Sequence, residues 1–161
     1  MFAGKVIAYT GMIDGKELSW LPSYGPEMRG GTANCSVCLS DEPIGSPLVL
    51  NPNGLIAMNL PSYDKFIDTV EAGGVAVIDS TLVEKKSGRT DISVFYVPAT
   101  SLADSENLKG LANMILLGKL LKETGFTNVD SVIKAMQKCI PPKKQHLLEP
   151  NEKAVRLGMS L

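Results

Sequence analysis

Val75-Ala76-Val77-Ile78-Asp79-Ser80 is the stretch that decides the predicted fold. Its four apolar residues are continuous rather than alternating with polar ones, which predicts a strand covered by other elements on both faces. The preceding Gly73-Gly74 pair ends a predicted helix, so the strand directly follows that helix. Asp79 and Ser80 lie at the carboxyl end of the strand, where open α/β sheets tend to bind ligands. An ordinary turn is the alternative interpretation of these two residues.

Helical and strand patterns alternate on both sides of this stretch. Apolar residues at helical spacing predict helices over residues 2–14, from Ser62 to Val70, over 104–124, from the Thr127-x-x-Asp130 capping box to Pro141, and briefly in the tail. Strands are predicted over residues 17–21, 32–39, 48–50, 55–60, 75–78 and 92–97. This alternation predicts an α/β fold, a three-layer α/β/α sandwich with a mostly parallel or mixed sheet.

Length and composition limit the classes of function. The chain has 161 residues, of which 44% are hydrophobic and 20% charged, which predicts one globular domain over residues 1–161. A net charge of −1 with scattered basic residues gives no footprint for nucleic acid or an anionic membrane. No apolar run reaches membrane-spanning length, and no signal peptide opens the chain. We therefore expect a cytoplasmic protein without nucleic-acid or membrane partners.

The three cysteines favour a reducing compartment over a disulfide framework because their number is odd. Cys35-x-x-Cys38 has the spacing of a zinc or redox motif, but the alternating pattern over residues 32–40 predicts a strand. Residues three apart on a strand point to opposite faces, so the two sulfurs cannot hold one metal ion. We predict no metal site here and two packed thiols.

The predicted helix over residues 104–124 is apolar almost all round between Leu111 and Leu121. A surface helix needs only one apolar stripe, so something must cover the excess. Two alternatives are open: burial at the centre of this domain, or burial against a partner subunit. The residues predicted to lie at such an interface are Asn113, Met114, Leu117 and Gly118, and Gly118 allows a second helix to approach closely in either case.

Residues 23–31, Ser-Tyr-Gly-Pro-Glu-Met-Arg-Gly-Gly, combine turn signals with charge. Pro26 fixes its φ, and the Gly30-Gly31 pair permits backbone conformations closed to other residues. Such a segment can form an anion-binding nest, with Arg29 offering a planar fork of donors. On local physics alone, a turn with solvated charges is the alternative.

This segment, extended back to Trp20-Leu21-Pro22, closely resembles the gamma subunit, or gamma domain, of 2-oxoacid:ferredoxin oxidoreductases. The resemblance continues through residues 34–44 and returns at residues 113–118, so it covers most of the chain. With a tyrosine at position 24, the sequence resembles the 2-oxoglutarate or branched-chain oxoacid branch of the family, because the indolepyruvate branch tends to have a histidine at this position. These enzymes oxidatively decarboxylate a 2-oxoacid to its acyl-CoA and pass the electrons to ferredoxin.

The resemblance implies a non-catalytic subunit that helps to close the active site and to bind coenzyme A. Thiamine diphosphate, Mg²⁺ and 4Fe–4S clusters would belong to the alpha, beta and ferredoxin-like delta subunits, with ferredoxin as the electron acceptor. The residues implied to face coenzyme A or a partner subunit are Tyr24, Gly25, Glu27, Arg29, Gly30 and Gly31. No catalytic residue is predicted, because His146 is the single histidine and the chain has neither a P-loop nor iron–sulfur cysteine spacing.

The sequence departs from the family at its start. Family members typically open with a strand and a glycine-rich GxGGQG loop before the helix predicted over residues 2–14, and we expect that this segment is missing from the sequence. Two other classes of function stay open: a stand-alone nucleotide- or coenzyme-A-binding α/β module, and a purely structural subunit. We expect the isolated chain to be inactive and to self-associate through surfaces meant for its partners.

Overall fold

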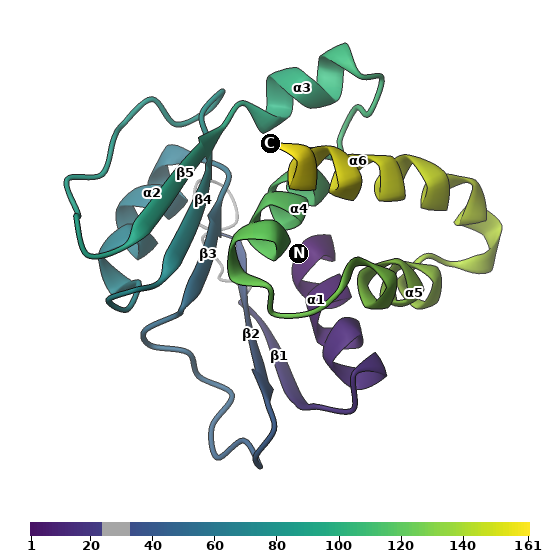
Figure 1. Ribbon diagram of the computed structural model, residues 1–161, viewed down its shortest axis with the longest axis horizontal. Coiled ribbons are helices and arrows are strands. Elements are labelled where there is room, and N and C mark those ends of the chain that lie inside the picture. Colours follow the sequence, from purple (N-terminus) through teal and green to yellow (C-terminus); the bar gives the residue numbers. More distant parts are fainter. Residues whose placement is uncertain (24–32) are drawn as a thin grey trace. The chain divides into compact units, whose positions relative to one another are not determined.

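The computed structural model describes residues 1–23 and 33–161. The chain divides into two compact units, and each unit is made of two segments that are separated in the sequence. The first unit consists of Met1–Val49 and Phe126–Leu148, and the second of Leu50–Gly125 and Glu149–Leu161. Figure 1 shows that each unit has its own sheet and its own helices. That the chain forms one domain of the gamma type stays a prediction.

The first unit is a helix-backed hairpin. Helix α1 (Phe2–Ile13) leads into β1 (Glu17–Ser23), which pairs antiparallel with β2 (Asn34–Ser40). Helix α5 (Val129–Cys139) packs against α1 and is followed by the 3-10 helix η2 (Pro142–Leu147). The α1, β1, β2 and α5 elements are those that the sequence predicts for these segments.

The second unit contains a parallel sheet with strand order β3-β4-β5. Its strands are β3 (Gly54–Ala57), β4 (Val75–Asp79) and β5 (Ser93–Val97). The stretch Val75–Asp79 is thus the central strand, and Ala76, Val77 and Ile78 are fully buried. A strand covered on both faces is what its continuous apolar sequence predicts.

Helices cover both faces of this parallel sheet, as Figure 1 shows. Helix α2 (Leu60–Phe66) and the 3-10 helix η1 (Ile67–Thr69) lie on one face, where Tyr63 and Ile67 pack into a core with Ala57, Ala76 and Ile78. Helix α4 (Ala112–Thr124) contacts β3 and β4 on the other face. The α/β prediction is confirmed, and the three layers lie in the second unit.

Two further helices complete the second unit. Helix α3 (Ala99–Ser105) packs against α4, and helix α6 (Leu148–Ser160) approaches α4 so closely that a Cβ on Gly118 would lie 2.0 Å from the carbonyl oxygen of Val155. A Cβ on Gly158 would likewise lie 1.9 Å from the carbonyl oxygen of Ile115. Two backbones can come this near only where both residues lack a side chain. Close approach at Gly118 is therefore confirmed, and the tail docks as a long helix.

Two predicted elements are wrong. Residues 48–50 form no strand: Leu48 is 65% exposed and Leu50 is 78% exposed, and the segment lies between Pro47 and Pro52, which have no N–H to donate to a ladder. The single helix predicted over residues 104–124 is two helices, α3 and α4. The break between them carries Asn107 and Gly110, both with positive φ.

The starts of two helices differ from the predicted ones. Helix α2 begins at Leu60 rather than at Ser62, and Asn59 caps it by accepting a hydrogen bond from the Ser62 N–H at 2.9 Å. Asn128, not Thr127, caps α5 in the same way through the Ser131 N–H at 2.9 Å. Among residues 1–23 and 33–161, no helix combines the length and apolar character needed to cross a bilayer.

Candidate functional site

The candidate residues of the sequence belong to the segment that connects β1 with β2. Ser23 pairs with Asn34 in the antiparallel register, so the chain leaves and re-enters the hairpin at the same end. Tyr24, Gly25, Glu27, Arg29, Gly30 and Gly31 belong to the connection between these two residues and lie outside the described part of the chain. Their role stays a prediction. The structure describes the two paired strands, β1 and β2, that this segment connects.

Helix α1 fixes the position of the hairpin by close packing. A Cβ on Gly4 would lie 2.3 Å from the Cys35 sulfur, and a Cβ on Gly11 would lie 2.4 Å from a methyl carbon of Leu39. The two glycines, seven residues and two helical turns apart, thus let one face of α1 lie directly on β2. Lys16 and Asp41 form an ion pair at 2.8 Å near the other end of the hairpin. Helix α1 therefore supports the hairpin along the length of β2.

A second contact connects α1 with the beginning of α5. Asp14 follows α1, and its carboxylate accepts hydrogen bonds from the hydroxyls of Thr127 and Ser131, the latter at 2.6 Å. Charge-assisted hydrogen bonds of this kind are roughly twice as strong as neutral ones. Asp14 therefore ties together segments that are more than 110 residues apart in the sequence.

The carboxyl end of β4 is a turn. Asp79 is fully buried, and its carboxylate accepts hydrogen bonds from the Thr100 hydroxyl at 2.6 Å and the Thr81 N–H at 3.1 Å. These bonds fix the beginning of α3 and the turn after the strand. The turn interpretation of Asp79 and Ser80 is confirmed. The buried Asp79 carboxylate accepts its hydrogen bonds from residues of the same chain.

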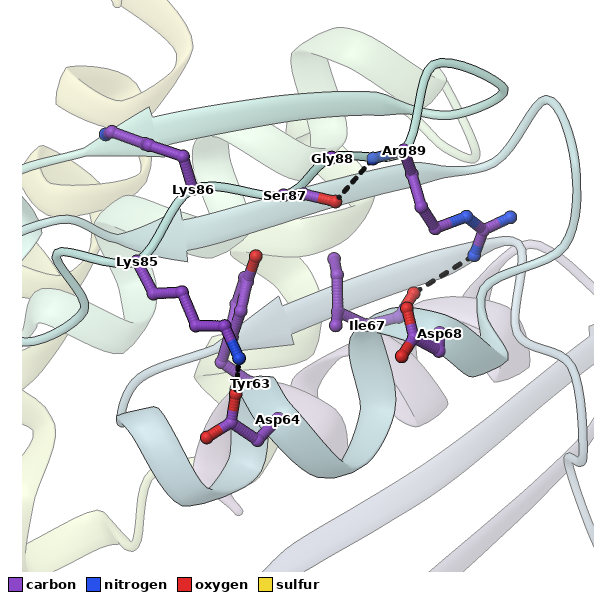
Figure 2. Close-up of a pocket in the computed structure, with 9 residues that line it drawn as sticks. All are labelled: Tyr63, Asp64, Ile67, Asp68, Lys85, Lys86, Ser87, Gly88 and Arg89. Carbon is purple, nitrogen blue, oxygen red and sulfur yellow. Dashed lines mark hydrogen bonds and ion pairs between the residues drawn. The ribbon is translucent and has the colours of Figure 1, made fainter.

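A pocket of about 310 Å³ lies between α2 and residues 85–89, which belong to the connection from β4 to β5 (Figure 2). Lys85 reaches Asp64 on α2 at 2.6 Å, and this hydrogen bond raises the pKa of Lys85. The Ser87 N–H donates to the Tyr96 hydroxyl at 2.6 Å. Burial raises the pKa of Tyr63, which lines the pocket, and its hydrogen bond with Tyr96 adds to the effect.

Arg89 closes one side of this pocket. Its guanidinium donates to both carboxylate oxygens of Asp91, at 2.9 and 2.5 Å, and to the carbonyl oxygens of Ile67 and Val70, at 3.0 and 2.6 Å. The hydrogen bond with Asp91 raises the pKa of Arg89, and it lowers the pKa of Asp91. The cations Lys85 and Arg89 are therefore paired with the carboxylates of Asp64 and Asp91. These contacts, with the bonds from Arg89 to the carbonyl oxygens, hold the connection from β4 to β5 against α2 and η1. The sequence gives no local signal for the pocket, because Lys85 and Asp64 are 21 residues apart.

The chain matches the pyruvate ferredoxin/flavodoxin oxidoreductase family over residues 1–161. It belongs to that family.

Relatives of the chain occur both as short subunits and as parts of longer ones. The 2-oxoglutarate synthase subunit KorC of Methanocaldococcus jannaschii is 35% identical over 150 residues, which is 87% of this chain and 80% of the relative. The ketoisovalerate oxidoreductase subunit VorA of Methanothermobacter thermautotrophicus is 39% identical over 127 residues, 79% of this chain. The match spans only about a quarter (26%) of VorA.

A solved structure has the same fold. The gamma subunit of a keto/oxoacid ferredoxin oxidoreductase from Geobacter sulfurreducens superposes with a TM-score of 0.82 at 28% sequence identity. The similarity covers 98% of this chain and 88% of the solved chain. The fold described above is thus the fold of a gamma subunit in the pyruvate ferredoxin/flavodoxin oxidoreductase family.

The described residues do not fit the inorganic cofactors of such an oxidoreductase. Cys35 and Cys38 lie on opposite faces of β2, and burial raises the pKa of the Cys139 thiol, which disfavours the thiolate that binds metal. Within residues 1–23 and 33–161, no three His, Cys, Asp or Glu side chains are grouped to hold a metal ion. An iron–sulfur cluster or a Mg²⁺ ion therefore has no ligand set in this part of the chain.

The four residues predicted for a subunit interface lie on α4. Met114 and Leu117 are fully buried by the chain itself, and Gly118 is covered by α6. Asn113 is half-buried. Burial inside this chain therefore accounts for the apolar surface of α4. Contact with another subunit at Asn113, Met114, Leu117 or Gly118 stays a prediction.

Proposed function

We propose that the chain is the gamma-type subunit of a cytoplasmic 2-oxoacid:ferredoxin oxidoreductase. The observation that carries the proposal is the family match over residues 1–161, together with the coverage of most of KorC. In KorC this portion makes up most of a separate subunit, whereas in VorA it is a fraction of a longer one. We infer that this chain works beside other subunits that carry the remaining parts of the enzyme.

In this proposal, the other subunits supply the redox chemistry. Alpha, beta and delta subunits would hold thiamine diphosphate, Mg²⁺ and 4Fe–4S clusters, and these groups would supply the chemistry of 2-oxoacid decarboxylation and of electron transfer to ferredoxin. The misfit of the described cysteines and carboxylates with metal binding supports this division of roles. The present chain contributes surfaces that orient the substrates and exclude water.

The connection of the β1–β2 hairpin, between Ser23 and Asn34, is the part of this chain that we place at the subunit junction near the active site. Its base is fixed by α1 through Gly4 and Gly11, which suits a segment that must hold its position against another subunit. Glu27 and Arg29 would make polar contacts across the junction, or Arg29 would bind a phosphate of coenzyme A.

The proposal is tested by purifying the chain, with an affinity tag, from native extract. We expect thiamine-dependent and iron–sulfur subunits to co-purify, and the assembly to reduce ferredoxin with a 2-oxoacid in the presence of coenzyme A. A panel of 2-oxoglutarate, 2-oxoisovalerate and pyruvate identifies the substrate; we expect one of the first two, in line with KorC and VorA. Purification of the chain without such subunits would contradict the proposal.

Substitution Arg29→Ala in the assembled enzyme tests the hairpin. We expect assembly to weaken, or the Michaelis constant for coenzyme A to rise, by about tenfold, since arginines at interface centres often contribute 1–2 kcal/mol or more. The matched control is Arg156→Ala, because Arg156 is an exposed arginine of α6 that pairs with Glu152 at 2.9 Å. Unchanged assembly and an unchanged Michaelis constant in Arg29→Ala would remove the role proposed for the hairpin.

A further inference from the structure

The first unit carries a concentrated positive charge on one stretch of its surface. Lys134 and Lys138 are one helical turn apart on α5, and Lys143, Lys144 and His146 follow on η2. All five side chains are exposed. We call these five residues the basic surface. Lys138 and Lys143 are five residues apart in the sequence, so their Cα atoms lie at most about 18 Å apart.

The basic surface contrasts with the rest of the chain. Residues 131–148 contain four lysines and no acidic residue, which gives a charge of +4 with His146 neutral. The other 143 residues carry 12 basic and 17 acidic side chains, a net charge of −5. The nearest acidic residues are Asp130, one turn before Lys134, and Glu149, after His146. The near-neutral total thus hides a strong local asymmetry.

The charges of the basic surface are uncompensated within the part of the chain that the structure describes. Four of the other lysines have acidic partners: Lys16 with Asp41, Lys85 with Asp64, Lys119 with Glu123, and Lys153 with Glu106. Lys5, Lys86 and Lys109, which are scattered along the chain, form no ion pair with a described residue. The four lysines of the basic surface form no ion pair with any described residue. Adjacent like charges repel at short range, so the native state gains nothing from gathering them.

Folding does not need these lysines either. The opposite side of α5 packs the unit, since Val132, Ala135 and Met136 are buried and the helix contacts α1. A surface that the fold does not require, and that its own charges disfavour, is best explained by a binding partner.

We propose that the basic surface binds an acidic surface on another protein. This inference does not depend on the proposed function. A polyanion such as duplex DNA extends beyond the patch and would meet the net charge of −5 carried by the other residues. Residues 131–148 also contain no Phe, Trp or Tyr, the side chains that stack on single-stranded bases and anchor helices at a bilayer surface. A compact acidic patch on a folded protein avoids both problems.

Binding of this kind acts mainly through encounter rate and orientation. Charges separated by more than about 8 Å are screened at physiological salt, so the attraction weakens steeply as salt rises. The expected signature is an association that depends strongly on ionic strength and on these lysines.

The test uses the full chain and a fluorescent poly-L-glutamate of about 20 residues as the acidic probe, with anisotropy measured at about 20 and 200 mM salt. The variants are Lys143→Glu/Lys144→Glu and Lys134→Glu/Lys138→Glu. The control is Lys65→Glu/Lys109→Glu, which changes two exposed lysines of the second unit and alters the net charge by the same amount. Thermal melting monitors the fold of each variant.

We expect the wild type to bind the probe at low salt and each basic-surface variant to bind about tenfold more weakly, with the control within about twofold of wild type. Equal weakening of the control would mean that total charge alone acts, which overturns the proposal. Absence of binding by the wild type would overturn it as well. Equal or tighter binding of a DNA duplex or of phosphatidylserine vesicles would assign the surface to another class of partner.

Discussion

Gly118 and Gly158 show how a single hydrogen atom in place of a side chain can set the distance between two helices. Each lies where its missing Cβ would enter the backbone of the facing helix, at 2.0 and 1.9 Å from a carbonyl oxygen. Backbone atoms in packed helices cannot yield as the end of a flexible side chain can. Larger residues at these positions must therefore push α4 and α6 apart.

Gly118→Ala and Gly158→Ala are each expected to lower the free energy of unfolding by about 1–3 kcal/mol, the usual range for forcing extra atoms into a packed core. Gly88→Ala is the control, because a Cβ there meets nothing within 4 Å. Its effect should stay within about 0.5 kcal/mol. Chemical denaturation measures all three variants, and a tolerated Gly118→Ala would show that the helices separate without cost.

The Arg89–Asp91 pair predicts an acid-dependent loss of stability. The hydrogen bond with Arg89 lowers the pKa of Asp91 in the folded state, so its contribution to stability is present above the ordinary pKa of aspartate and is lost as the pH falls through the lowered value. Asp91→Asn should therefore be less stable than wild type at pH 7; the difference should begin to shrink near pH 4, the ordinary pKa of aspartate, and vanish only below the lowered pKa. Urea unfolding against pH tests this, with the exposed Asp104→Asn as the control. A difference independent of pH would contradict the assignment.

At the scale of elements, the caps of α2 and α5 are both asparagines placed directly before the helix. Asn128→Ala removes the acceptor for the Ser131 N–H and should destabilise the protein by about 1 kcal/mol, whereas Asn128→Asp should retain most of the stability. Thermal denaturation of the two variants measures the difference. Equal stability of the Ala and Asp variants would mean that the cap bond contributes nothing.

Elements with strong periodicity could be predicted from the sequence. The unbroken apolar run of β4 and the helical stripe of α1 correspond to the residues that these elements bury. The alternation in β2 predicts its strand, although all seven residues of that strand are half-buried. Short or interrupted patterns were ambiguous. Residues 48–50 are apolar enough for a strand, but the prolines on either side favour an exposed connection. The break between α3 and α4 depends on the backbone at Asn107 and Gly110, which periodicity does not record.

At the scale of the whole molecule, the family and its fold could be predicted from residues 20–31 and 113–118, whereas the internal pairing could not. The contacts of Asp14 with Ser131 and of Lys85 with Asp64 join residues far apart in the sequence, and no local pattern announces them. The candidate site itself, residues 24–31, lies outside the described residues. What the structure adds is the pairing of Ser23 with Asn34 on either side of that segment and the close packing of α1 on β2.

Leu48 and Leu50 are the side chains through which we expect the isolated chain to self-associate. Both are large, apolar and highly exposed, and they belong to one connection. Leu48→Ser/Leu50→Ser should lower the average mass measured by light scattering at high protein concentration, with stability unchanged to within about 0.5 kcal/mol. The control is Leu82→Ser, a solitary leucine that is 52% exposed. A wild-type chain that is monomeric throughout would contradict the expectation.

The interleaving of the two units has a consequence for biosynthesis. The ribosome delivers α1 and the hairpin before the parallel sheet, but the helix that packs on α1 is encoded only after residue 125. The nascent first unit must therefore wait, with the side of α1 that contacts α5 uncovered, while the intervening segment emerges. The two units cannot fold one after the other along the chain, as the domains of many multidomain proteins do. The second unit likewise stays incomplete until Glu149–Leu161 has been made.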